Sequence, residues 1–176
     1  VNPLTVYAEA NCKAEEGCLP LGSESFCVTA LRFATVYGRS YRMRFDLAVN
    51  GMTLGFFREG KIPVLRDGTQ WRPFIHVKDV AMAFITALRA DPAVVNGQVF
   101  SVGCDEQNVQ ILPLARSVAE AIGVPFAMEW YGDPDHRSYR VDFSKIVSAL
   151  SFRPTFRPAD GAAEGHSGLG AGTLDA

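Results

Sequence analysis

The chain has 176 residues, of which 48% are hydrophobic and 20% charged, and 17 basic against 19 acidic residues leave a formal net charge of -2. This composition supplies a core for about one domain, excludes a wholly disordered chain and argues against a dedicated nucleic-acid binder. No stretch approaches the roughly 20 apolar residues of a membrane span and no signal peptide is visible, so we predict a cytoplasmic protein with no membrane partner.

Helix-like and strand-like segments alternate along the chain. Apolar residues at helical spacing predict helices within residues 2–16, 43–57, 78–90, 111–122 and 142–150. Apolar runs bounded by glycine or proline predict strands within residues 26–36, 62–65, 73–77, 98–102 and 126–131. This alternation is typical of α/β proteins with a parallel sheet. Residues 159–176 are rich in glycine and small residues with little to bury, and are predicted to be a disordered tail.

Two kinds of site are not expected from the sequence. No glycine pair follows a strand and opens a helix at the G-x-G-x-x-G spacing, so the glycine-rich phosphate cradle of a dinucleotide site is absent. The cysteines form no C-x-x-C pair and the histidines show no metal-ligand spacing, so we predict no metal site. In a reducing cytoplasm we expect free, mostly buried thiols at Cys12, Cys18, Cys27 and Cys104.

Tyr7 lies near the start of the first predicted helix. A tyrosine there can donate or accept a proton when a cation one helical turn later lowers the pKa of its hydroxyl. The residue at that position is Asn11, which is neutral, and Lys13 starts on another side of the helix. Spacing alone therefore leaves two interpretations of Tyr7 open: an acid/base, or a packed ring with a solvated hydroxyl.

The most informative stretch is residues 67–81. Arg72 stands between a turn and an apolar strand, where a fixed guanidinium can bind a phosphate through two parallel hydrogen bonds. His76 is interpreted as a hydrogen-bonded structural histidine rather than a catalytic one, and Asp79 as the cap of the following helix.

A third cluster, residues 131–142, contains the glycine and proline of a loop. Its Arg137, Tyr139 and Arg140 can close over an anionic or sugar ligand. A solvated surface loop is the equal alternative.

Four motifs follow one another in this chain: P-x-x-x-Y at residues 3–7, L-R-F-A-T-V-Y-G at 31–38, D-G-x-x-x-R-x-F-I-H-V-x-D-V-A at 67–81, and Y-x-x-D-x-S-K at 139–145. In this order they resemble the second half of the extended short-chain dehydrogenase/reductases, specifically the NAD-dependent epimerase/dehydratase family that works on nucleotide sugars. The resemblance implies that residues 1–158 form the C-terminal part of a Rossmann-like parallel sheet plus a small substrate-binding domain, with the N-terminal NAD-binding half absent.

The resemblance also implies an activity and its partners. In the family, hydride passes to and from NAD or NADP while a tyrosine removes a proton from a hydroxyl of a nucleotide-diphosphate sugar. Family members often dimerise, so a homodimer is a further implied assembly. Because the phosphate cradle is absent, we expect the isolated chain to bind NAD weakly or not at all and to be inactive.

Position in the motifs assigns roles to eight residues. The catalytic tyrosine, which also touches the cofactor, is Tyr7. The other cofactor-binding positions are Asn11, Phe33 and Ala34. The substrate-binding positions are Thr35, Arg72, Arg137 and Tyr139.

The chain departs from the family motif Y-x-x-x-K, because Asn11 replaces the lysine. Asparagine can bond a ribose hydroxyl but cannot supply the charge that stabilises tyrosinate, and each lost unit of pKa depression is worth about 1.4 kcal/mol, or tenfold in reactive phenolate. Two functions therefore stay open: part of an active epimerase or dehydratase, or a truncated or vestigial nucleotide-sugar-binding module without catalysis.

Overall fold

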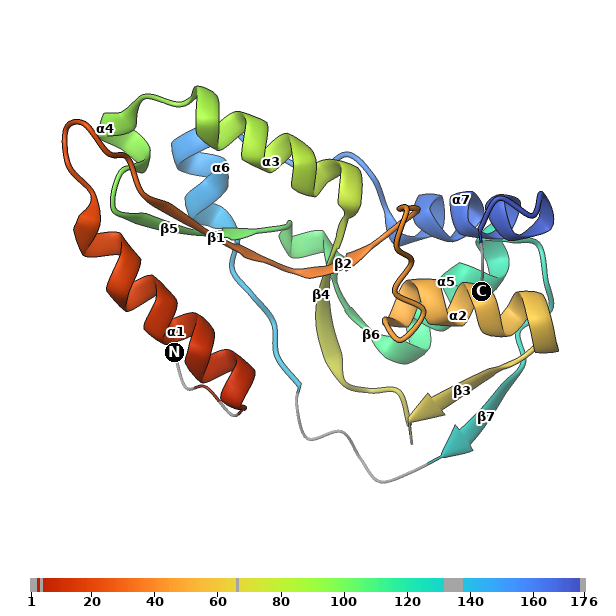
Figure 1. Ribbon diagram of the computed structural model, residues 1–176. Coiled ribbons are helices and arrows are strands. Elements are labelled where there is room, and N and C mark those ends of the chain that lie inside the picture. The colour runs from red at the N-terminus through yellow and green to blue at the C-terminus, as the bar shows by residue number, and fades with distance from the viewer. Residues whose placement is uncertain (1–2, 4, 66, 132–137, 175–176) are drawn as a thin grey trace.

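The computed structural model describes residues 3, 5–65, 67–131 and 138–174 (Figure 1). Its helices are α1 (Val6–Cys18), α2 (Ala48–Glu59), α3 (Val77–Arg89), α4 (Pro92–Val95), α5 (Ile111–Ala121), α6 (Ser144–Leu150) and α7 (Pro158–Gly170). Its strands are β1 (Thr29–Phe33), β2 (Thr35–Tyr37), β3 (Ile62–Leu65), β4 (Trp71–His76), β5 (Gln98–Val102), β6 (Asn108–Gln110) and β7 (Met128–Tyr131). Among the described helices, none combines the length and the apolar character that crossing a membrane requires.

Parallel pairing dominates the strands. β1 pairs with β5, β2 with β4 and β3 with β7, all parallel, while β6 adds an antiparallel strand to the other edge of β4. Parallel strands need crossover connections, which the intervening helices provide. The predicted α/β class with a parallel sheet is therefore confirmed.

β4 lies between two hydrophobic clusters. Phe74 belongs to a cluster that joins α2, α5 and α7 to β3, whereas Ile75 belongs to one that joins β5, α3 and α6. Both side chains are fully buried, and neighbouring residues on a strand point to opposite faces. Figure 1 shows the same division, with β4 between the two groups of elements.

The apolar run predicted as one strand over residues 26–36 is divided in the structure. β1 ends at Phe33 and β2 begins at Thr35, because the chain changes its partner from β5 to β4 at this point. The first strand also begins later than predicted, since Phe26 precedes β1 and is 57% exposed. The prediction of a strand buried on both faces is therefore wrong for the first residues of this run.

The prediction of a disordered tail over residues 159–176 is wrong, because α7 occupies most of it and packs against α2 and α5. Gly161, Gly165 and Gly168 are all buried and recur at helical spacing, so much of the inward face of the helix carries no side chain. A Cβ on Gly161 would lie 2.5 Å from the Tyr37 ring. Glycine lowers intrinsic helix propensity, yet here it permits a close approach between the helix and its neighbours.

The four cysteines are free thiols, but the expectation that they are mostly buried is wrong. Cys12 and Cys104 are half-buried, and Cys18 and Cys27 are exposed. Cys18 ends α1, a helix with no buried residue, and Cys27 lies in the exposed segment that precedes β1.

Candidate functional site

α1 presents the predicted catalytic tyrosine to solvent. Thr5 caps the helix by accepting a hydrogen bond from the Ala8 amide at 3.1 Å, and Tyr7 follows in the first turn with 78% of its surface exposed. Asn11 is exposed one turn later.

One ion pair anchors α1 to β1. The Arg32 guanidinium donates to both carboxylate oxygens of Glu15. This hydrogen bonding lowers the pKa of Glu15 and raises that of Arg32. Because α1 buries no residue, this pair is a principal described contact between the Tyr7 helix and the sheet.

Neighbouring side chains at the end of β1, which include the predicted cofactor-binding residue Phe33, face opposite ways. Arg32 reaches α1, whereas the ring of the next residue, Phe33, lies 5.2 Å from that of Phe84 on α3. Since neighbouring side chains on a strand alternate, α1 and α3 cover opposite faces of β1. The structure therefore does not bring the Phe33 ring to the face that carries Tyr7. Ala34 is buried, and its amide donates to Val102 at 3.1 Å.

Two of the predicted substrate-binding residues are in contact. Arg72 is half-buried near the start of β4, and its guanidinium carbon lies 5.3 Å from the centre of the Tyr139 ring. Its Nη1 also donates to the Trp71 carbonyl at 2.8 Å. Thr35 lies on the neighbouring strand, opposite Phe74 in the β2–β4 register. The predicted Arg137 lies outside the described residues.

A second arginine–aromatic pair lies next to the first. The guanidinium carbon of Arg140 lies 4.7 Å from the centre of the Trp71 ring. From the sequence, Arg140 is predicted only as a loop cation, and no role is predicted for Trp71. The signal was the repetition of an aromatic residue followed by arginine, at residues 71–72 and again at 139–140.

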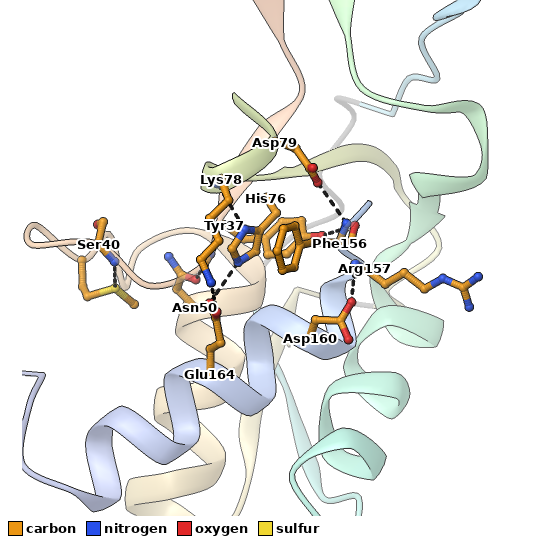
Figure 2. Close-up of polar contacts among 12 residues, drawn as sticks. Tyr37, Ser40, Asn50, His76, Lys78, Asp79, Phe156, Arg157, Asp160 and Glu164 are labelled. Atoms are coloured by element: carbon orange, nitrogen blue, oxygen red, sulfur yellow. Dashed lines mark hydrogen bonds and ion pairs between the residues drawn. The ribbon is translucent and has the colours of Figure 1, made fainter. Parts of the chain in front are cut away.

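The far end of β4 is a buried polar network, shown in Figure 2. His76 is fully buried, its Nδ1 accepts from the Lys78 amide at 3.2 Å, and its Nε2 lies 3.1 Å from Glu164. Burial lowers the pKa of His76 despite the nearby Glu164 carboxylate. These contacts confirm the interpretation of His76 as a structural histidine.

Asp79 has a different role from the one predicted. The cap of α3 is His76, while Asp79 lies inside the helix and is 2% exposed. Its carboxylate accepts hydrogen bonds from the Thr155 amide and hydroxyl at 3.0 Å and from the Phe156 amide at 3.1 Å. Asp79 therefore holds the segment that leads into α7, a partner too distant in sequence for local spacing to reveal.

A cavity of about 830 Å³ opens between α5 and residues 153–159, and Cys104, Arg153 and Arg157 are among its lining residues. None of the described residues assigned to the cofactor or the substrate lines it. Burial raises the pKa of the Cys104 thiol, which makes it a poor nucleophile at neutral pH. Within the described parts of the chain, no group of three or more histidine, cysteine or acidic side chains is placed to hold a metal ion.

Known proteins are similar to this chain in both sequence and fold. The model of the NAD dependent epimerase/dehydratase family matches residues 1–103. A dTDP-glucose 4,6-dehydratase from an Actinoplanes species is 33% identical over 108 residues, which cover 58% of this chain and 32% of the relative.

Two solved structures share the fold. A UDP-glucose 4-epimerase with UDP-glucose from Thermotoga maritima has a TM-score of 0.83 at 20% identity, covering 98% of this chain and 56% of that one. A UDP-glucuronic acid 4-epimerase from Bacillus cereus, in complex with UDP-glucuronic acid and NAD, has a TM-score of 0.80 at 24% identity. The match covers 97% of this chain and 54% of that one.

The chain thus spans about a third of the dehydratase and little more than half of each epimerase structure. The family match covers more than half of the chain, and it includes the motif residues from Tyr7 to Arg72. From its sequence and its fold, this chain belongs to the NAD dependent epimerase/dehydratase family.

Proposed function

We propose that the chain is the substrate-binding part of an NAD-dependent nucleotide-sugar epimerase or dehydratase. The observation that carries this proposal is the contact between Arg72 and Tyr139, 5.3 Å apart, beside the strand that bears Thr35. A guanidinium held in this way suits bidentate hydrogen bonds to a diphosphate. The relatives support the same substrate class, since they include a dTDP-glucose dehydratase and epimerases solved with UDP-glucose or UDP-glucuronic acid.

In this proposal Tyr7 is the acid/base. As a phenolate, it takes the proton of a sugar hydroxyl and later returns that proton to the sugar. NAD, when bound, would supply hydride transfer at the sugar carbon that bears this hydroxyl. Tyr7 and Asn11 fit only the ribose of the cofactor, because the pyrophosphate requires backbone N–H groups at a helix N-terminus behind a glycine-rich turn, and the sequence has none.

The surface around β1 supports an active form that contains a further α/β half. Among the described strands β1 pairs only with β5, so its other edge carries unpaired backbone groups. Large apolar side chains are exposed nearby, including Phe26 (57%) and, on α3, Met82 (50%) and Leu88 (83%). A unit that adds a parallel strand to β1 and a helix to each face would cover the edge and these side chains. The NAD-binding half is the unit that we propose.

A second candidate is a nucleotide-sugar-binding module without catalysis, and Asn11 favours it. The family lysine would stabilise tyrosinate from this position, whereas the amide of Asn11 carries no charge.

The proposal is tested by titrating the 176-residue chain with UDP-glucose, UDP-glucuronic acid and dTDP-glucose in calorimetry, with NAD as a separate titrant. We expect binding of at least one nucleotide sugar, and no measurable binding of NAD. Loss of charge-assisted hydrogen bonds in Arg72→Gln should weaken the affinity by about tenfold or more. Arg89→Gln, at an exposed arginine on α3, is the matched control and should bind as the parent chain does. Equal affinities for Arg72→Gln and Arg89→Gln would contradict the proposal.

Catalysis needs a separate test in the complete enzyme. Tyr7→Phe should abolish turnover and leave nucleotide-sugar affinity nearly unchanged, since the phenol moves a proton rather than holding the diphosphate. Asn11→Lys should raise turnover by stabilising tyrosinate. A parent enzyme without turnover would favour the binding module, and no gain from Asn11→Lys would count against the assigned role of the missing lysine.

A further inference from the structure

We propose that Trp71 and Arg140 form a clamp that holds residues 138–140 against the start of β4 and so positions Arg72 and Tyr139 for the nucleotide. The inference that the clamp exists rests on geometry alone. Its effect on binding rests on the proposed function.

Two hydrogen bonds first bring the two segments together. The Trp71 amide donates to the Ser138 hydroxyl at 3.0 Å, and the Tyr139 amide donates to the Trp71 carbonyl at 3.3 Å. Residues 138–140 therefore run alongside the first residue of β4, on exposed backbone. Two hydrogen bonds at a solvated edge hold such a segment only weakly, so side chains must decide how firmly it is held.

Two arginine–aromatic pairs supply those side-chain contacts. Arg72 on β4 lies over Tyr139 of the segment, and Arg140 of the segment lies over Trp71 on β4, with guanidinium carbons 5.3 and 4.7 Å from the ring centres. Each side thus contributes one cation and one ring. Because neighbouring residues in extended chain alternate in direction, the pairs lie on opposite faces of the two-segment ribbon.

The far end of the segment is already fixed. The Asn108 side chain is 6% exposed, accepts from the Val141 amide at 2.8 Å and donates to the Val141 carbonyl at 3.0 Å. Asn108 lies on β6, opposite Pro73 of β4. The chain is therefore held at Val141, and the Arg140–Trp71 contact sets its direction from that point toward Tyr139.

This arrangement separates two roles. Arg72 and Tyr139 are the groups offered to the ligand, while Trp71 and Arg140 act from the other face through them. Trp71 and Arg140 are therefore positioning residues. A solvent-accessible cation–π contact changes an equilibrium by about two- to fivefold, and this is the effect that we expect from losing the clamp.

The clamp is tested first without any ligand, on the 176-residue chain. Amide hydrogen exchange at Tyr139 should be about two- to fivefold faster in Arg140→Gln and Trp71→Ala than in the parent chain. Arg140→Lys and Trp71→Phe keep a cation and a ring, and should restore much of the protection. The matched control is Arg116→Gln, because Arg116 lies 4.5 Å over the Phe126 ring in another part of the molecule. Equal exchange at Tyr139 in Arg140→Gln and Arg116→Gln would overturn the clamp.

The second readout is affinity for UDP, measured on the same variants. Arg140→Gln should weaken UDP binding by about two- to fivefold, Arg140→Lys less, and Arg116→Gln not at all. Faster exchange with unchanged UDP affinity would overturn the positioning role. If the parent chain binds dTDP-glucose but no uridine nucleotide, the affinity is measured with dTDP-glucose instead. If it binds none of these nucleotides, the proposed function fails, and hydrogen exchange still decides whether the clamp exists.

Discussion

Gly161→Ala tests how closely α7 packs against the rest of the molecule. An added Cβ would lie 2.5 and 2.8 Å from two carbons of the Tyr37 ring, inside van der Waals contact. Tyr37 cannot easily move, because it is 1% exposed and its hydroxyl lies 3.1 Å from both the Gln107 side chain and the Phe156 carbonyl. Overpacking of this kind costs about 1–3 kcal/mol, while alanine in a helix recovers about 0.5–1 kcal/mol. We expect the free energy of unfolding to fall by about 1–2 kcal/mol.

Gly170→Ala is the matched control at the other end of the same helix. A Cβ on Gly170 meets no atom within 4 Å, so this variant keeps only the gain in helix propensity, up to about 1 kcal/mol. Urea denaturation followed by circular dichroism measures both variants against the parent chain. Opposite changes in the free energy of unfolding support the packed helix. If both substitutions stabilise the protein equally, α7 does not pack as described.

Three further perturbations probe contacts described above. Asp79→Ala leaves the Thr155 and Phe156 amides without their acceptor. It should lower the free energy of unfolding, measured by urea titration, by about 3 kcal/mol. A loss below about 1 kcal/mol would show that Asp79 does not hold this segment. Burial lowers the pKa of His76 from 6.5, so below that pH the unfolded chain binds more protons than the folded chain and the free energy of unfolding should fall on acidification. His76→Gln should flatten this dependence in urea titrations at several pH values, and a slope equal to that of the parent chain would refute the assignment. Glu15→Gln should speed proteolysis within α1 and barely change the free energy of unfolding of the whole chain. The reason is that α1 buries no residue and is held by the ion pair between Glu15 and Arg32. An unchanged rate of cleavage would mean that other contacts hold the helix.

Elements that depend on local chemistry were predictable from the sequence. β5 occupies the predicted residues 98–102, between Gly97 and Gly103, and α5 ends just before Gly123. Gly97 and Gly123 adopt positive φ angles of 69° and 72°, which glycine tolerates best. The apolar spacing of α5 likewise marks the face that enters the core. The apolar spacing of α3 does not, because Phe84 and Leu88 are 48% and 83% exposed.

Elements that depend on a distant partner were not predictable. The glycines of α7 oppose a helix in isolation, and only the neighbouring Tyr37 ring and α2 explain why they occur. Asp79 has the residue type and place of a helix cap, but its acceptor atoms face Thr155 and Phe156. In the candidate site, motif spacing identified Arg72 and Tyr139, whereas their contact and the Trp71–Arg140 pair require the fold.

The position of β4 between the two hydrophobic clusters has a consequence for evolution within the family. Phe74 packs in one cluster and Ile75 in the other, so a change of volume in either cluster pushes on the same strand. Well-packed interiors transmit such strain rather than absorbing it. Arg72 lies two residues from Phe74, so we expect its position to respond to substitutions on both sides of the molecule. Drift in core volume is one route by which ligand preference can diverge while every residue that touches the ligand stays the same.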